Sequence, residues 1–143
     1  MAPDPHLVIA AVLAASLSGC ATTSDPVGGA TSNQLAINPF DQPGARPGVF
    51  LAGRLEGTLT SDGRCVIVVQ AAQSVTPLWP GGTTVLDAGG RATVSLPDGR
   101  GSAALGKRVT LSGGAFPAAD AGRLADAVRR NCPGPFFVVA TVD

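Results

Sequence analysis

Apolar and polar side chains alternate regularly from residue 49 onward. Leu51, Leu55 and Leu59 fall on one face of an extended segment, and Arg54 and Glu56 fall on the other. Alternation with a period of two is typical of a β-strand with one buried face. Glycines separate the leucines on the inward face, which favours a strongly coiled or bulged strand of the kind found in small barrels.

Turn sequences then recur about every ten residues. Asp-Gly or Gly-Gly dipeptides, which favour tight hairpins, occur at 62–63, 89–90 and 98–99. This spacing is typical of a sandwich or a barrel. The repeated Asp-Gly-Arg sequence, at 62–64 and 98–100, also suggests a binding loop, but turn geometry alone accounts for it. The turns separate short runs over 65–70, 83–87, 91–96 and 107–113.

A helix is expected to interrupt the strands over about 120–130 and to plug one end of the barrel. Asp120 is a suitable N-cap, apolar side chains follow at helical spacing, and Asp126 precedes Arg130 by four residues, a favourable ion-pair spacing. The run FFVVATV over 136–142 is almost wholly apolar and rich in β-branched residues. It predicts a central strand that is buried on both faces.

Residues 48–143 therefore predict one mainly β domain of about 96 residues, with a single core. A small antiparallel barrel of OB-like or Greek-key type, with one helix in its C-terminal half, fits the glycine-bent first strand and the inserted helix. A β-sandwich is the alternative. The order of the strands is not predicted by the sequence.

The first twenty residues follow a different pattern. Residues 7–17 form an apolar run without charges, about half the ~20 residues that a membrane-spanning helix needs. The run ends in Leu17, Ser18, Gly19 and Cys20, and this motif resembles the lipobox of bacterial lipoprotein precursors. The resemblance implies a signal peptide over 1–19 and diacylation of the Cys20 thiol. The alternative is a buried helix followed by an ordinary thiol.

Residues 20–47 are rich in Ala, Thr, Ser, Gly and Pro and show no sustained period. They predict a lipidated, flexible tether with a reach of roughly 30 Å. As an alternative, Leu35, Ile37 and Phe40 dock on the domain. Ala21 stands where an Asp retains many lipoproteins at the inner membrane, so the resemblance implies the periplasmic face of the outer membrane in a Gram-negative cell.

The other two cysteines, Cys65 and Cys132, are an even pair in a chain that we expect to be exported. We predict that they form a disulfide that closes a loop of about 66 residues and contributes ~4 kcal/mol. Two reduced, buried thiols are the alternative. A metal site is disfavoured, because only carboxylates could complete its ligand set.

The side chains left after removal of a signal peptide restrict the chemistry. Residues 20–143 contain no His, Tyr or Met, and Lys107 is the only lysine. The usual general base and the usual nitrogen ligand of zinc are therefore missing, and we expect no metal or cofactor. The formal charge is about +1 and the basic residues are scattered, so a nucleic-acid partner is not expected.

Four carboxylates remain as candidates for acid–base chemistry: Glu56, Asp62, Asp87 and Asp98. A pair of carboxylates can hydrolyse a glycosidic bond. Three of these four lie in turn sequences, however, where Asp is expected for backbone reasons alone. We therefore assign no catalytic residue.

Two further features suggest binding. Trp79, the only tryptophan, lies in a Pro- and Gly-rich run over 77–82 that predicts a loop, where an exposed indole can stack on a sugar or anchor a protein. The alternative is that Trp79 caps the end of the core. Gly113 and Gly114 follow a strand, but the other residues of a phosphate-binding loop are missing, so a simple turn is expected.

The sequence thus predicts a lipid-anchored protein of the cell envelope, acting as a non-catalytic binding or structural module. Its expected partners are the membrane, through the lipid on Cys20, and an envelope protein or polysaccharide. Two alternatives are a carboxylate-dependent glycan hydrolase and an inhibitor of an extracellular enzyme, the latter by analogy of architecture.

Overall fold

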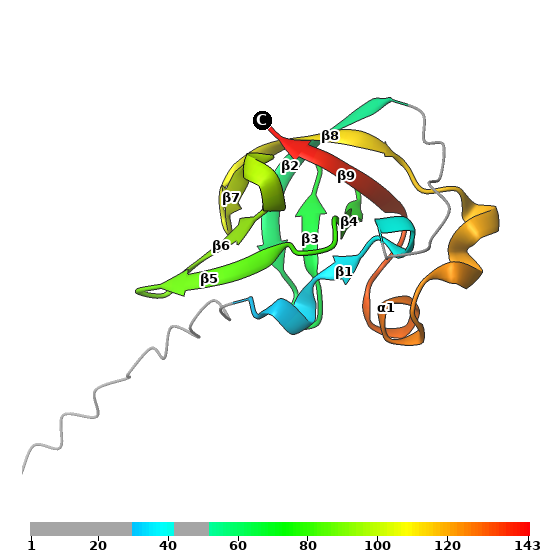
Figure 1. Ribbon diagram of the computed structural model, residues 1–143, viewed down its shortest axis with the longest axis horizontal. Coiled ribbons are helices and arrows are strands. Elements are labelled where there is room, and N and C mark those ends of the chain that lie inside the picture. The colour runs from blue at the N-terminus through cyan, green and yellow to red at the C-terminus, as the bar shows by residue number, and fades with distance from the viewer. Residues whose placement is uncertain (1–29, 42–51) are drawn as a thin grey trace, which may run out of the picture.

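The computed structural model describes residues 30–41 and 52–143 of the chain (Figure 1). The predicted signal peptide, Cys20 and the stretches of the predicted tether over 20–29 and 42–47 lie outside the described residues. The described part contains nine β-strands and one α-helix. None of the helices in this part is long and apolar enough to span a membrane.

Five strands close into a barrel, which confirms the prediction of a small OB-like or Greek-key barrel (Figure 1). They pair around the barrel in the order β2-β3-β4-β9-β8 and back to β2. The pairing is antiparallel, as predicted, at every pair of neighbours except one, because β4 and β9 run parallel. The strands are β2 (Gly53–Ser61), β3 (Val66–Val69), β4 (Ser74–Trp79), β8 (Arg108–Ala115) and β9 (Phe136–Val142).

The alternation that predicted the first strand is seen in β2. Leu55 and Leu59 are 5% and 0% exposed and belong to the core inside the barrel, whereas Arg54 and Glu56 are exposed on the outer wall. The short turn to β3 is closed by the N–H of Asp62, which donates to the carbonyl of Cys65 at 3.2 Å. The Asp-Gly sequence therefore forms the predicted hairpin.

A second sheet of three antiparallel strands is inserted between β4 and β8. It consists of β5 (Thr84–Ala88), β6 (Arg91–Ser95) and β7 (Ser102–Ala104), in that order. Gly89 and Gly90, with φ of 64° and 78°, form the two-residue turn that joins β5 to β6. Ala92 and Val94 of β6 pack into the same core as the barrel, and in Figure 1 the β5–β6 hairpin reaches away from it.

The helical region differs from its prediction. A 3-10 helix (Ala118–Arg123) and the short α1 (Asp126–Asn131) replace one continuous helix, and the Asp120 side chain caps neither of them. The break brings Leu124 into a cluster with Ile67, Leu78 and Val138. These three strand residues alternate with core residues and so point outward, which means that the region covers the barrel wall and does not plug its end.

The ion pair expected within this helical region is present. Asp126 Oδ2 lies 3.9 Å from Arg130 Nη1, four residues further along α1, and Asp126 also pairs with Arg129. All three side chains are largely exposed. Such a pair supports a helix of this length only modestly.

Strand β9 is buried on both faces only over its first half. Phe137, Val138 and Val139 are each at most 8% exposed, whereas Ala140 is exposed and the following two residues are half-buried. The pairing of β9 with β4 also ends at Val138. The predicted two-sided burial is therefore confirmed where β4 flanks the strand and wrong beyond that point.

Residues 30–41, here called the strap, pack on the barrel. Within them, β1 (Ala36–Ile37) pairs parallel with the end of β4, and Asn38 N–H donates to the Trp79 carbonyl at 2.8 Å. Ala30, Leu35 and Ala36 are buried. A flexible tether is therefore the wrong prediction for these residues and the docking alternative is right, because their apolar side chains complete both hydrophobic clusters.

Cys65 and Cys132 form the predicted disulfide, with their Cα atoms 5.4 Å apart. Both residues are buried, at 2% and 8% exposure, in the cluster outside the barrel wall. The bond joins the residue before β3 to the residue after α1. It therefore fixes the helical region against the wall that it covers.

Candidate functional site

The four candidate carboxylates lie on four different elements. Glu56 is on the outer face of β2, and Asp98 is in the short 3-10 helix Pro97–Gly99. Asp62 accepts hydrogen bonds from the N–H groups of the two residues that follow Gly63, at 2.8 and 2.7 Å. Asp87 accepts one from Gly90 N–H at 3.1 Å, so at least two of the four act in turns.

Residues of metal-binding type do not gather either. Within residues 30–41 and 52–143, no group of three or more His, Cys, Asp or Glu side chains is placed to hold a metal ion. The two cysteines that could have contributed thiolates are consumed by the disulfide.

Trp79 is a core residue, so the predicted loop is wrong. It is the last residue of β4, is 0% exposed and packs among the side chains inside the barrel. Its indole Nε1 has no hydrogen-bond partner among the residues that the structure describes. The alternative, in which Trp79 completes the core, is the correct one, and this indole is not presented to a ligand at the surface.

The position of Pro77 within β4 explains how a strand can form where the sequence predicted a loop. Thr76 N–H donates to the Pro135 carbonyl at 2.9 Å on the β9 side, so the nitrogen of Pro77 faces the opposite side. On that side, pairing with β3 ends at Val75 and pairing with β1 begins at Leu78. The missing N–H of proline therefore falls in a gap between two neighbours and interrupts neither ladder.

Gly113 and Gly114 form neither a turn nor a phosphate loop, because both lie inside β8. The register shifts between Ser112 and Gly113, where β9 bulges. A Cβ atom added to Gly113 would lie 1.8 Å from the carbonyl oxygen of Val138. Only glycine permits this approach, so the Gly-Gly pair serves the closure of the barrel.

A groove of about 690 Å³ opens on the outer wall over this glycine pair, and we call it the glycine groove. It runs between the beginning of β2 and the exposed part of β9, where Gly113 and Gly114 contribute no side chains. The groove is open to solvent and is not an enclosed cavity. Its floor and walls are formed by Gly113, Gly114, Val138 and Ala140, and its polar rim by Arg54 and Ser112.

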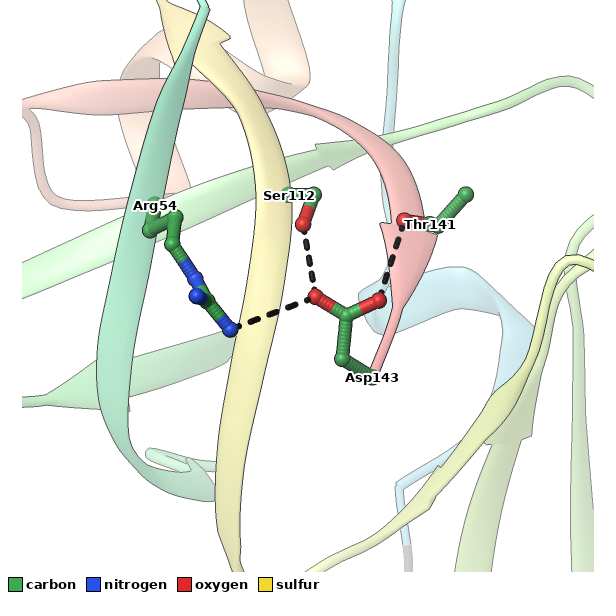
Figure 2. A network of polar contacts seen from close by, with 4 residues as sticks. All are labelled: Arg54, Ser112, Thr141 and Asp143. Atoms are coloured by element: carbon green, nitrogen blue, oxygen red, sulfur yellow. Dashed lines mark hydrogen bonds and ion pairs between the residues drawn. The ribbon is translucent and has the colours of Figure 1, made fainter.

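A polar network fixes this rim, as Figure 2 shows. Arg54 Nη2 lies 3.7 Å from Asp143 Oδ2, which also accepts a hydrogen bond from the Ser112 hydroxyl at 2.7 Å. The Thr141 hydroxyl donates to the other carboxylate oxygen at 3.5 Å. The network therefore ties together β2, β8 and β9, and it holds the cationic end of Arg54 beside the glycine groove.

Sequence reasoning missed the network and the groove. Alternation did place Arg54 on the outer face of its strand, but nothing in the sequence indicated that Ser112 and Asp143 lie beside it. The contacts arise only when the barrel closes. The Arg54 and Asp143 side chains are 65% and 47% exposed, so the ion pair orients the arginine and adds little stability.

Comparison of the chain with protein-family models, with curated proteins and with solved structures found no significant match. The fold class is thus defined by the strand pairings themselves: a five-stranded barrel with an inserted sheet and a disulfide-bonded outer layer.

Proposed function

We propose that this chain is a lipid-anchored protein of the bacterial cell envelope whose barrel acts as a non-catalytic binding module. The disulfide between Cys65 and Cys132 carries the proposal, because such bonds persist outside the reducing cytosol. The lipobox-like motif that ends in Cys20 agrees with export, and it supplies the anchor. The periplasmic face of the outer membrane is the proposed location.

The candidate site supports binding more than catalysis. The carboxylates are dispersed over four elements, and two of them hold turns together. The glycine groove, in contrast, combines an apolar floor with one oriented cation, Arg54, and a hydroxyl, Ser112. An envelope protein or polysaccharide that combines an apolar face with hydrogen-bond acceptors is the ligand that this combination favours.

The docked strap limits how far the barrel stands from the membrane. Ala30 is buried in the core, so at most the ten residues 20–29 separate the lipidated thiol from the barrel. Ten extended residues reach at most ~36 Å. In this proposal the barrel works within that distance of the headgroups.

Mass spectrometry of the chain purified from membranes tests the proposal. We expect an N-terminus at diacylated Cys20 and a disulfide between residues 65 and 132. Cys20→Ser should abolish incorporation of a clickable palmitate analogue and leave the leader uncut. As a matched control, Cys65→Ser combined with Cys132→Ser should keep the label. An intact N-terminus in the cytosolic fraction, with both thiols reduced, would refute the proposal.

A further inference from the structure

The outer edge of β5 has no partner in the described part of the chain. β5 pairs only with β6, which in turn pairs with β7. Figure 1 shows that the β5–β6 hairpin reaches out from the barrel. An edge of this kind presents free backbone donors and acceptors, and it is a template for another strand.

The side chains of β5 are also unusually open. Four of its five residues are exposed, and Val85 is half-buried. Leu86 is 62% exposed, and among the described residues only it and Val69 are large exposed hydrophobic residues. Natural edge strands usually carry charged residues or proline as protection, and in β5 Asp87 is the only such residue.

The hairpin turn determines which backbone groups are free. A two-residue turn makes its flanking residues, Ala88 and Arg91, a hydrogen-bonded pair, so every second residue of β5 bonds to β6. Val85 and Asp87 lie between these positions. Their N–H and C=O groups therefore point away from β6, toward the open edge.

We propose that β5 pairs antiparallel with β5 of a second copy, which joins two three-stranded sheets into one sheet of six strands. Val85 of each copy then lies opposite Asp87 of the other, and the free groups of each are satisfied. Leu86 lies opposite Leu86 at the two-fold axis, in a non-hydrogen-bonded pair where side chains approach most closely. The exposed leucines thus cover each other.

Charge, hydrogen bonding and the exposed leucine together select this register over its neighbours. A shift by two residues in one direction would set Asp87, the only charged residue of β5, directly opposite its own copy, where like charges are destabilising. The same shift in the other direction would centre the pairing on Val85 and leave each Leu86 opposite Thr84. A shift by one residue would place the free N–H and C=O groups of one copy opposite residues whose own groups point toward β6, so these hydrogen bonds would not form. The register centred on Leu86 avoids all three faults.

A pair of five-residue strands buries less than the ~1,200 Å² that a stable free interface needs. The contact is therefore expected to be weak in dilute solution and to gain from confinement on one surface, which raises the effective concentration. That gain rests on the proposed lipid anchor. The register does not depend on it.

Disulfide formation in cells expressing the full-length chain tests the register. Leu86→Cys places two thiols opposite each other at a Cα separation of ~4.5 Å, suitable for a disulfide. Thr84→Cys is the matched control on the same face, because Thr84 lies opposite Ala88 and ~13 Å from its own copy. Oxidation should link residue 86 to 86 at least about tenfold more than 84 to 84, since Cα atoms beyond ~7 Å are not bridged.

Mixed expression strengthens the test. Chains with Thr84→Cys and chains with Ala88→Cys, carrying different tags, should link to each other, and a Leu86→Lys substitution in both should suppress this link by placing two cations face to face. Thr84→Lys combined with Leu86→Cys should not suppress the 86–86 link. The wild-type chain measures any background crosslinking between copies through Cys20.

Three results would overturn the inference. Equal yields at positions 84 and 86 would indicate random collision. A thiol at position 86 that links to another protein would assign the edge to a different partner, and one that links within its own chain would assign it to a segment of this chain. The same crosslinks are also measured in a Cys20→Ser background. If only the anchor is lost, the total yield of crosslinked dimer falls but position 86 is still preferred over position 84. If the pairing itself is wrong, this preference is absent in both backgrounds.

Discussion

The close approach of β9 to Gly113 predicts a large effect from one added methyl group. In Gly113→Ala the new Cβ would lie 1.8 Å from the carbonyl oxygen of Val138 and 2.9 Å from its carbonyl carbon. Both atoms belong to the backbone, so no side-chain rotation relieves the clash. The two strands would have to separate by more than 1 Å at this point even to reach 3.0 Å, below which Cβ atoms essentially never approach another heavy atom.

The cost follows from what holds the strands together there. Gly113 pairs with Val139 and Gly114 pairs with Val138, next to the register shift. Overpacking costs ~1–3 kcal/mol, and each weakened backbone hydrogen bond adds ~1 kcal/mol. We expect a loss of about 3–4 kcal/mol, a large share of the ~5–15 kcal/mol that stabilises a domain. With a urea m-value of ~1.5 kcal/mol/M, the midpoint falls by ~2 M or more.

Trp79 provides the assay, because the only tryptophan of the chain is fully buried and its fluorescence reports unfolding. Gly122→Ala is the matched control, since a Cβ at Gly122 meets no atom within 4 Å. Its unfolding free energy should change by less than ~0.5 kcal/mol. A Gly113→Ala midpoint equal to that of Gly122→Ala, at the same m-value, would refute the reasoning.

Three further predictions test other parts of the structure. Replacing Cys65 and Cys132 together with Ser should lower the unfolding free energy by ~4 kcal/mol in the same urea assay, and an unchanged midpoint would contradict the bond. In hydrogen-exchange NMR the Asn38 amide should be protected by the Trp79 carbonyl, whereas exchange at the rate of a free peptide would show an undocked strap. Arg54→Ala should cost less than ~1 kcal/mol by thermal or urea unfolding, and a loss above ~2 kcal/mol would show that the exposed network matters more than its exposure implies.

Local patterns predicted those elements whose stability is decided locally. Strand β2 was predicted from its alternation, and the hairpin turns from their Asp-Gly and Gly-Gly dipeptides, because each of these signals acts within a few residues. The disulfide followed from counting cysteines in a chain expected to be exported. The barrel class then followed from strand spacing, without the strand order.

The failures share one physical cause, which is contact between distant segments. Pro77 is tolerated in β4 only because two different neighbours leave a gap on one side, and Gly113 is needed only because β9 bulges against it. Each sequence signal taken alone indicates a turn or a loop. The strap was predicted wrongly for the same reason. Its few apolar residues form no local pattern, and they are buried only because they contact the two hydrophobic clusters of the barrel.

The strap and the helical region over 118–131 form a layer outside the barrel wall, and this layer limits which surfaces of the barrel are open to partners. Gln34 of the strap accepts a hydrogen bond from the Ser61 hydroxyl at 2.8 Å and donates one to the Gly63 carbonyl at 3.3 Å. That turn leads into Cys65, whose disulfide holds the end of α1. Strap, turn and helix are therefore tied to β3 and β4, and they cover that side of the barrel. The glycine groove beside Arg54 and the free edge of β5 lie outside this layer, so the proposed binding and the proposed self-association fall on different elements and can be tested separately.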